Sequence, residues 1–430
     1  MANKNSNFSK LKNLKNDFPW FKNHRDLVFF DSAATTLKPQ VVINAISNYY
    51  QKYSTNTHSI DFPVALDTNT IYQDTRKIVA QLLNCQADEI VFCPSATFAL
   101  NQIAYSLGFY LKPGDEVILT ACEHSSLLLP FYRLAQEKKI VLKFIEVASD
   151  GLITVENLTK VLTNKTRIVA FANVNNSLGT VNDVKQLTKV INHYSLKNLS
   201  DAVWPFKKIL VLIDAAQSIS HIKTNVQDWA VDFLAFSGHK IFGPTGIAVW
   251  WGKKQWLRLL KPLILGGGMN GRIYQDGNFT FLNPPDVFEG GSPNIAGVFG
   301  LQAAIEYLLK IGVTNIAQHQ IQLKQYAVRE FKKHFPNQII IYNENQATGT
   351  LLFNVNNVFA EDVANYLGHK NICLRSGNFC AKLLSTVIKC ASSLRVSFFV
   401  YNNETDIDKL VLALQQGFKD GGDFLNDFFK

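Results

Sequence analysis

The chain has 430 residues, 47% of them hydrophobic and 18% charged, a balance that is typical of a globular protein with a large core. Its formal net charge of +9 raises the question of nucleic-acid or anionic membrane partners. The basic residues are spread along the chain without a long block and without interleaved aromatics, so the charge reflects a lysine-rich composition. The composition therefore predicts neither a nucleic-acid nor a membrane partner, although the charge would favour an acidic partner protein.

The six cysteines are spaced neither as a disulfide framework nor as a metal site. There is no Cys-x-x-Cys pair, and no cysteine has a histidine at the spacing of zinc ligands. We therefore predict no metal, and the cysteines of a chain this large fit a reducing cytoplasm. All except one are expected to be small buried hydrophobes.

No targeting or membrane segment is predicted. Residues 1–17 are rich in Lys and Asn and lack the apolar core of a secretory signal, with only a weak amphipathic pattern of the kind found in transit peptides. The longest uncharged stretch, 90–111, has the length of a membrane span. Because it contains Pro94 and Gly108, it reads better as a strand, a turn and a buried helix.

Helices and strands alternate from residue 70 to about 250. The apolar patterns predict helices at 71–83, from 97, from about 126, at 155–162 and at 184–193, and strands at 90–93, 116–120, 140–145, 167–171, 209–213 and 231–236. Such alternation predicts a mostly parallel sheet covered on both faces, with ligands beyond the carboxyl ends of its strands. After Gly290 the pattern changes to two helices (295–310 and 313–334), short strands and a closing helix from about 405. This change predicts a second, smaller α/β domain.

A lysine and an acid follow two successive strands of the predicted sheet. Lys240 ends the turn Ser237-Gly-His-Lys after the strand 231–236, and Asp214 ends the strand 209–213, shortly before Gln217. A lysine buried at a strand end loses its proton to desolvation and becomes a nucleophile toward a carbonyl. Pyridoxal phosphate (PLP) needs such a lysine for its aldehyde and an acid that keeps its pyridine nitrogen protonated. The turn motif alone is equally compatible with an ordinary loop lysine, but Asp214 and Gln217 favour a PLP site.

Three other strand ends carry polar groups of matching chemistry. Ser95-Ala-Thr97 opens a helix and offers N–H groups and a hydroxyl to a phosphate, and Glu123-His124 brings a histidine that could stack on a planar ring. Asn173-Val-Asn-Asn176 follows the strand 167–171. Each has an ordinary alternative as a helix cap, an exposed loop or a turn. Their occurrence after successive strands favours one shared ligand site.

With these motifs, the chain resembles cysteine desulfurases of the PLP-dependent aminotransferase class V family, particularly the SufS-like branch. The resemblance runs from Asp31-Ser-Ala-Ala-Thr-Thr-Leu-Lys-Pro39 to Arg395 and includes Asn56-Thr-His58 and Gly266-Gly-Gly-Met269. It implies the α/β fold of PLP enzymes of fold type I, with a large, mostly parallel sheet domain and a smaller carboxy-terminal α/β domain. The expected division is a segment at 1–30 that packs with the small domain, a PLP-binding domain at 31–290 and the small domain at 291–430.

The resemblance also implies a role for each site residue. Lys240 is expected to bind the aldehyde of PLP, His124 to stack on its ring, and Ser292 to reach its phosphate across a dimer interface. The cofactor-binding positions of the family fall on Thr97, His124, Asp214, Gln217, Ser237, His239, Lys240 and Ser292. Its substrate-binding positions fall on His58, Asn176 and Arg395, and its catalytic positions on His124, Lys240 and Cys380.

The segment Arg375-Ser-Gly-Asn-Phe-Cys380 matches the desulfurase signature. Gly377 predicts a tight or mobile loop that holds Cys380 at the surface, where its thiol could attack the sulfur of PLP-bound cysteine. The chain departs from the branch at Phe379, where a histidine is usual, and at Lys382-Leu383. Phe379 would make the loop more apolar, and Lys382 would stabilise the thiolate of Cys380.

The resemblance thus implies a homodimeric cysteine desulfurase of the cytoplasm. Such an enzyme converts L-cysteine to L-alanine and leaves a persulfide on Cys380, which passes to an iron–sulfur scaffold or a sulfur-carrier protein. A selenocysteine lyase and another class V aminotransferase remain alternatives, although an aminotransferase would not need Cys380. A catalytically silent binding protein with this fold is a further alternative, which the intact Lys240, Asp214, His124 and Arg395 disfavour.

The link from Ser195 to Phe206 is longer than a usual helix–strand connection and carries Trp204 and Phe206. We hypothesise that these rings contact a second protein or subunit, because aromatic residues are enriched at interfaces. The alternative is an aromatic plug folded onto the subunit's own helix.

Overall fold

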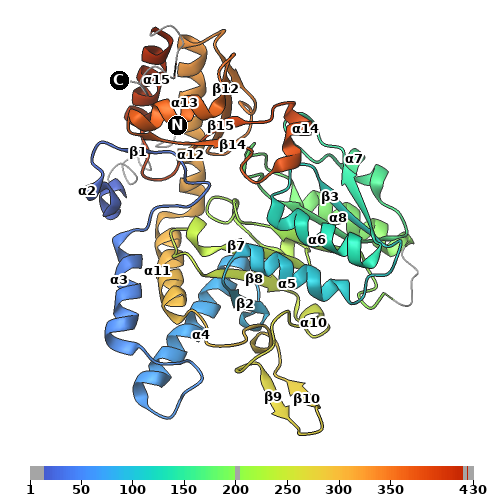
Figure 1. Cartoon of the computed structure of the whole chain (residues 1–430). Coiled ribbons are helices and arrows are strands. Elements are labelled where there is room, and N and C mark those ends of the chain that lie inside the picture. Colours follow the sequence, from blue (N-terminus) through green and yellow to red (C-terminus); the bar gives the residue numbers. More distant parts are fainter. Residues whose placement is uncertain (1–13, 199–203, 420–423, 425–430) are drawn as a thin grey trace, which may run out of the picture.

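A seven-stranded sheet forms the centre of the larger part of the molecule (Figure 1). The computed structural model describes residues 14–198, 204–419 and 424. The sheet has the order β2-β8-β7-β6-β5-β3-β4, and β8 runs against the other strands. The bounds are β2 (Ile90–Cys93), β3 (Glu116–Thr120), β4 (Val141–Ile145), β5 (Thr166–Ala172), β6 (Leu210–Asp214), β7 (Phe233–Ser237) and β8 (Ala248–Gly252).

Helices cover both faces of this sheet. Side chains alternate between the faces of a strand, so Val117 and Leu119 pack in one apolar cluster while Ile118 packs in another. The first cluster includes α5 (Ala96–Gly108) and α6 (Ser125–Lys138). The second includes α4 (Pro63–Leu83), α7 (Val155–Val161), α8 (Val184–Asn198) and α11 (Ile295–Ile311). The predicted α/β architecture is therefore confirmed.

A smaller antiparallel sheet lies at the upper end of the molecule in Figure 1. Its order is β11 (Ile339–Ile341), β12 (Thr350–Val355), β15 (Ser393–Ser397) and β14 (Arg375–Gly377). One apolar cluster joins it to α12 (Val313–His334), α13 (Ala360–His369) and α15 (Glu404–Lys419). Beside it, β1 (Val28–Phe29) pairs in parallel with β13 (Ile372–Cys373).

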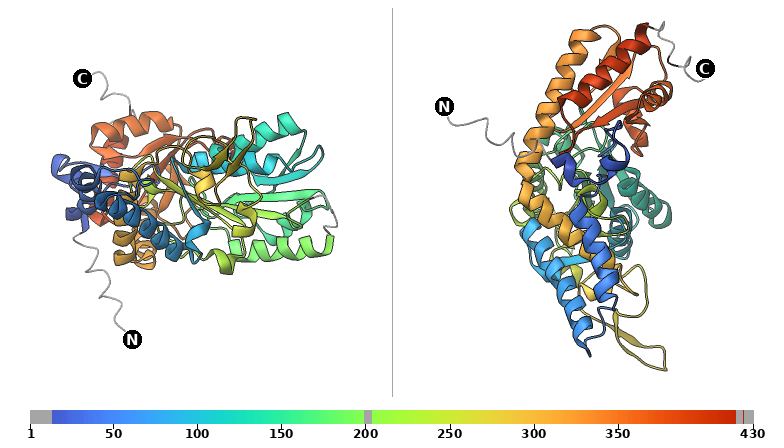
Figure 2. Two further views of the ribbon diagram at one scale, coloured as in Figure 1. Left: turned by 90° about the horizontal axis from the view of Figure 1, so that it is seen from below. Right: turned by 90° about the vertical axis from the view of Figure 1, so that its left-hand side faces the viewer.

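Helices α11 and α12 connect the two sheets and run along much of the molecule (Figure 2). They meet at Gly312, whose φ of +89° is in the region that favours glycine. α11 packs on α3 (Gln40–Asn48) and α4, while α12 packs on α15. Within the described residues no single helix is long and apolar enough to cross a membrane; α11 and α12, bent by 71°, meet that test only as a pair.

Some elements had no counterpart in the sequence analysis. They include the helices α3 and α13, the short strands β1, β13 and β14, and the antiparallel strand β8. They also include the exposed hairpin of β9 (Asn270–Ile273) and β10 (Phe279–Phe281), which projects at the bottom of Figure 1. Short helices also went unpredicted: α2 (Trp20–Asn23), α9 (Val226–Trp229), α10 (Lys254–Leu257) and α14 (Ser385–Ile388). The division into segments at residues 30 and 290 stays a prediction. Helix α11 lies after residue 290 but packs with helices that cover the large sheet.

The predicted partner contact of Trp204 and Phe206 is wrong. Both side chains are buried within one subunit, with exposed fractions of 2% and 1%. The Trp204 indole donates a hydrogen bond to the carbonyl of Lys208 (2.7 Å), and Phe206 packs against Trp256. The rings pack in the apolar cluster on one face of the large sheet. Burial of apolar surface therefore accounts for aromatic residues in this link. Residues 199–203 of this link lie outside the described part.

Candidate active site

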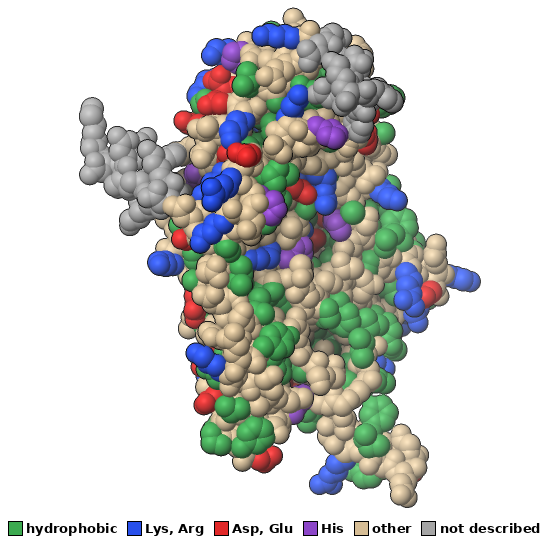
Figure 3. All heavy atoms as spheres, turned by 60° about the vertical axis from the view of Figure 1, so that its left-hand side comes forward, with side chains coloured by type: hydrophobic (Ala, Val, Ile, Leu, Met, Phe, Trp, Pro, Cys, Tyr) green, Lys and Arg blue, Asp and Glu red, His purple; other side chains and the backbone are tan. Residues whose placement is uncertain are grey.

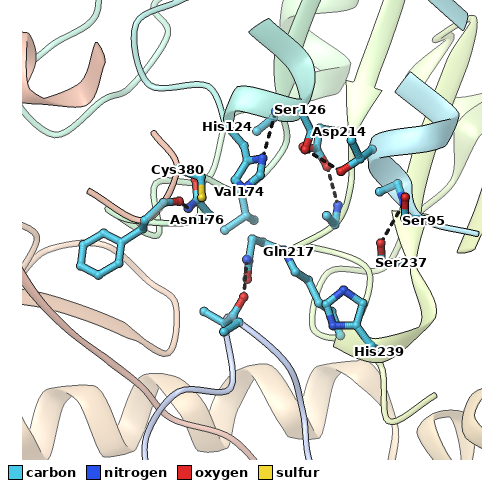
Figure 4. A pocket seen from close by; sticks show the side chains of 18 of the residues that line it. Ser95, His124, Ser126, Val174, Asn176, Asp214, Gln217, Ser237, His239 and Cys380 are labelled. Atoms are coloured by element: carbon cyan, nitrogen blue, oxygen red, sulfur yellow. Dashed lines mark hydrogen bonds between the residues drawn. The ribbon is translucent and has the colours of Figure 1, made fainter. Parts of the chain in front are cut away.

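A cavity of about 250 Å³ lies at the carboxyl ends of the parallel strands (Figure 4). Its lining comes from loops of the large sheet, from Ala33 and Ala34, and from the small sheet, which contributes residues within 375–380 and Arg395 of β15. It brings together most of the predicted site residues: Thr97, His124, Asn176, Asp214, Gln217, Ser237, His239, Lys240, Cys380 and Arg395. A parallel sheet collects side chains at this edge because the loops after its strands meet there.

Lys240 lies in a short turn (Gly238–Lys240) directly after β7. Burial lowers the pKa of its amine to about 8; the carboxylate of Asp214 opposes this shift, and the nearby cation of Arg395 adds to it. A substantial fraction of the amine is therefore neutral near physiological pH, as a nucleophile or a base must be.

Asp214 is the last residue of β6 and is buried at the floor of the cavity. Its Oδ1 accepts a hydrogen bond from the backbone N–H of Ala216 (2.9 Å). Gln217 is fixed in the following turn, because its side-chain amide donates to the carbonyl of Ala33 (2.8 Å). These bonds hold an acid and an amide in set orientations at one end of the cavity.

Another part of the cavity wall has the features of an anion site. Helix α5 begins there, and Ser95 caps it by accepting from the N–H of Phe98 (3.1 Å). The hydroxyl of Thr97 lies 2.7 Å from that of Ser126, and Ser237 accepts from the N–H of Ala96 (2.9 Å). Hydroxyls at the positive end of a helix suit a phosphate.

His124 is the amino-terminal cap of α6 and extends into the cavity (Figure 4). Its Nδ1 accepts a hydrogen bond from the N–H of Ser126 (3.1 Å), which leaves the proton of the neutral ring on Nε2. Burial, and then the charge of Lys240, lower the pKa of His124. Burial likewise lowers the pKa of His239 to about 4. Both rings are therefore neutral at pH 7, and the His124 ring is free to lie against a flat aromatic group.

Glu123, the neighbour of His124, is a buried carboxyl whose hydrogen-bond donors are neutral groups. It accepts from the hydroxyl of Thr120 (2.6 Å) and from the N–H of Ala172 (2.9 Å). Burial raises its pKa to about 8, and the nearby charge of Asp214 adds to the shift. Glu123 is thus protonated at neutral pH.

Glu123→Gln is expected to remove one source of pH dependence in stability. The pKa of Glu123 is raised from 4.5 to about 8 by folding, so its contribution is complete below about pH 4.5 and is lost as the pH rises through 8. The loss is on the order of a few kcal/mol. The free energy of unfolding, measured with urea, should fall more between roughly pH 5 and pH 9 for the native chain than for the variant. The exposed Glu137→Gln serves as control, and equal drops in Glu123→Gln and the native chain would contradict the assignment.

Two arginines share one carboxylate above the cavity. Arg395 is 1% exposed and donates to Asp31 (Nη2 to Oδ1, 3.0 Å) and to the carbonyl of Asn176 (2.9 Å). Arg375 approaches the other oxygen of Asp31 at 3.3 Å. Burial lowers the pKa of Arg395 to about 10, so it remains a cation. Among the described residues its buried Nε has no hydrogen-bond partner, which leaves a donor available to a carboxylate.

Cys380 is the exposed cysteine of the chain; the other five are buried or half-buried. The backbone of its loop is held to the large sheet. Asn176 donates its amide to the carbonyl of Phe379 (2.8 Å), and Ser125 donates its N–H and its hydroxyl to the carbonyl of Cys380 (2.7 and 2.8 Å). Lys382 does not line the cavity, whereas Arg375 does. The predicted effect of Lys382 on the thiolate therefore stays a prediction.

Ser292 and His58 lie away from this cavity within one subunit. Both are exposed; the amide of Asn56 lies 3.5 Å from the Ser292 hydroxyl, and His58 lies beside Gly268, in a separate pocket that both residues line. Their expected roles in binding phosphate and substrate stay predictions.

The sequence analysis did not assign roles to Asp31, Glu123, Ser126 or Arg375. Arg375 and Asp31 were read only as parts of motifs, because their pairing joins distant segments. Ser126 could have been found from its position two residues after His124, at the start of the expected helix.

Comparisons with known proteins agree with this geometry. The model of the aminotransferase class-V family matches residues 28–410. A probable cysteine desulfurase of Ureaplasma parvum serovar 3 is 40% identical, covering 97% of this chain and 99% of that protein. Another, of Halalkalibacterium halodurans, is 35% identical over 92% of this chain and 94% of its own length.

Solved structures give the same result. The apo cysteine desulfurase of Thermococcus onnurineus NA1 superposes with a TM-score of 0.86 at 31% identity, covering 94% of this chain and 97% of that one. The cysteine desulfurase CsdA of Escherichia coli, in its S-sulfonic acid form, also has a TM-score of 0.86, at 30% identity over 95% and 98% of the two chains. The predicted fold type is thereby confirmed, and the chain belongs to the aminotransferase class-V family.

Proposed function

We propose that this protein is a PLP-dependent cysteine desulfurase that collects the sulfur of L-cysteine on Cys380. The observation that carries the proposal is that a half-buried lysine, a buried acid and the exposed cysteine, Lys240, Asp214 and Cys380, line one cavity. The two relatives described above, which the chain matches over nearly its whole length, are named probable cysteine desulfurases.

The residues around the cavity suit PLP in both charge and shape. An anion site at the start of α5 would hold the phosphate, with Thr97, Ser237 and His239 around it. Asp214 would face the ring nitrogen and Gln217 the ring hydroxyl, with His124 against the ring. When bound, PLP draws electrons from the bonds at the α-carbon of an amino acid. This chain's part is to orient the two molecules and to move protons.

The substrate would be held by its carboxylate and its proton removed by Lys240. The free Nε of Arg395 supplies a donor for the carboxylate, and Asn176 lies beside it. With a pKa near 8, Lys240 can accept the α-proton as a neutral amine and return it later. His124, neutral in this site, can donate only from Nε2.

Sulfur transfer needs Cys380 as a thiolate. It attacks the sulfur of the substrate, so that an S–S bond forms and the Cβ–S bond breaks. The electron pair of the broken bond stays with carbon, where a proton replaces sulfur and alanine results. Cys380 then carries a persulfide, and a thiol that attacks the outer sulfur takes it away and restores Cys380. An iron–sulfur scaffold or a sulfur-carrier protein in the cytoplasm is the proposed acceptor.

Incubation of the PLP-loaded protein with L-cysteine tests the function. Without an added reductant, alanine should form rapidly up to about one equivalent per site and then slowly, because each Cys380 accepts one sulfur and only free cysteine is left to remove it. With a thiol reductant, alanine and sulfide should form continuously and in equal amounts. Failure to form alanine from cysteine under both conditions would overturn the proposal. Alanine formed only from selenocysteine would favour a selenocysteine lyase.

Asp214→Asn is expected to retain PLP but lose about a hundredfold or more in turnover. A neutral amide cannot keep the ring nitrogen protonated, so the ring no longer accepts electrons well. Bound PLP is measured by visible absorbance and turnover by alanine release. Asp228→Asn, a surface residue paired with Lys185, is the matched control and should behave as the native protein. Near-native turnover of Asp214→Asn would exclude the assigned role.

A homodimer is the proposed assembly. Large exposed hydrophobic side chains gather on the lower part of the face in Figure 3, over the segments 50–66 and 264–282. They include Tyr50, Ile60, Phe62, Leu66, Ile264, Leu265, Ile273, Phe279, Phe281 and Leu282. An exposed apolar area of this kind is typical of an interface. Ser292 and His58 lie next to it, which is where residues must lie to reach the cavity of a second subunit.

A further inference from the structure

Phe379 is the residue by which the nucleophile loop is anchored in the protein. Its side chain is 6% exposed, although Cys380, the next residue, is exposed. The ring belongs to a small apolar cluster formed with residues of both sheets: Cys122, Leu178, Leu352, Ala381 and Leu384. It is thus the point where the loop enters the interior.

The ring also lies against the cation that would bind the substrate carboxylate. The guanidinium carbon of Arg395 is 4.7 Å from the centre of the Phe379 ring. Arg395 is buried, so the contact is shielded from water and is stronger than at a surface. One aromatic ring therefore links the position of Cys380 to the position of Arg395.

The loop backbone needs such an anchor because its conformation is costly. Phe379 and Cys380 have φ angles of +53° and +61°, a region that residues with a Cβ rarely adopt. Two such residues in succession persist only where surrounding contacts hold them. Inside the loop, Asn378 accepts from the N–H groups of Cys380 (3.2 Å) and Ala381 (2.9 Å). The contacts that tie the loop to the rest of the protein include the Phe379 ring and the backbone bonds from Asn176 and Ser125.

We propose that Phe379 is a positioning residue for sulfur transfer, holding the strained loop closed so that Cys380 stays beside the substrate. The proposal deepens the proposed desulfurase function and rests on it. A phenyl ring has no titrating group, so the contact between this ring and Arg395 does not itself change with pH. A histidine at this position would become a cation against Arg395 at low pH and would be repelled.

The test compares Phe379→Ala, Phe379→Leu and Phe379→His in the PLP-loaded protein. Backbone hydrogen exchange of residues 375–384 should rise about tenfold in the Ala variant and less in the Leu variant. Alanine formed in a single turnover should slow by a similar factor, about tenfold. Binding of L-alanine, followed by the cofactor spectrum, should change less than about threefold. The His variant should behave as the Leu variant near pH 8.5 and as the Ala variant near roughly pH 5.5.

Phe353→Ala is the matched control, a buried phenylalanine of β12 that packs in a different apolar cluster. It should lower overall stability while leaving loop exchange and single-turnover alanine near native values. Native behaviour of Phe379→Ala in both readouts would overturn the proposal, as would a pH-independent His variant. If Phe379→Ala does not fold, the Leu and His variants decide. If the native protein makes no alanine from cysteine, the function fails, while hydrogen exchange still reports on the loop.

Discussion

Cys380→Ser is expected to bind cysteine normally and to release almost no alanine. In the proposed function, binding would use Lys240, Arg395 and the substrate's own amine and carboxylate, none of which needs the thiol. Removal of sulfur needs it, because a serine hydroxyl cannot accept a sulfur atom to form a persulfide. We expect alanine production to fall by about a thousandfold or more, while addition of cysteine still changes the absorbance of PLP.

Mass spectrometry gives a second measurement of the same prediction. The native protein treated with cysteine alone should carry one additional, reducible sulfur on the peptide that contains Cys380, and the variant should carry none. Cys390→Ser is the matched control, since Cys390 is half-buried beyond the cavity lining. Normal alanine production by Cys380→Ser would refute the mechanism. Activity retained toward selenocysteine alone would favour a lyase, because selenium can leave without a thiol acceptor.

Lys240→Ala is expected to remove the covalent attachment of PLP and with it all measurable turnover. Lys240 is the lysine that lines the cavity in the described chain, so no other amine is available there to bind the aldehyde. Borohydride should fix PLP onto the native protein and not onto the variant. Activity should fall by roughly ten-thousandfold or more, since proton transfer at the α-carbon is lost as well.

Lys185→Ala controls for loss of a lysine as such, because Lys185 is an exposed partner of Asp228. It should retain both borohydride labelling and activity. Turnover of cysteine by Lys240→Ala at the native rate would contradict the assignment of PLP to this site.

The central strands and the strand-end residues could be read from the sequence because their signals are local. Strands 90–93 and 116–120 are fully buried and are built around short apolar runs, and Ser95 and Glu123 follow them within three residues. Lys240 and Asp214 were found for the same reason. The parallel order of the sheet then brought the separate strand ends together.

The remainder could not be read because it depends on contacts between distant segments. Strand β8 contains Trp250 and Trp251 and gives no sign that it runs against its neighbours. The pairing of Asp31 with Arg375 and Arg395 joins the two ends of the matched region. Trp204 and Phe206 misled the analysis because an aromatic pair has the same composition in a core as at an interface.

The pairing of β1 with β13 has a consequence for how the chain is made. A ribosome delivers the amino-terminal part first, and a strand is stable only beside its partner. Val28 and Phe29 therefore stay unpaired until Ile372 and Cys373 have been synthesised, near the end of translation. Asp31, two residues after β1, reaches Arg395 only at that stage. The cavity is thus completed late, after the sheet that bears Lys240 has been translated, because Cys380 and Arg395 lie in the last part of the chain to emerge.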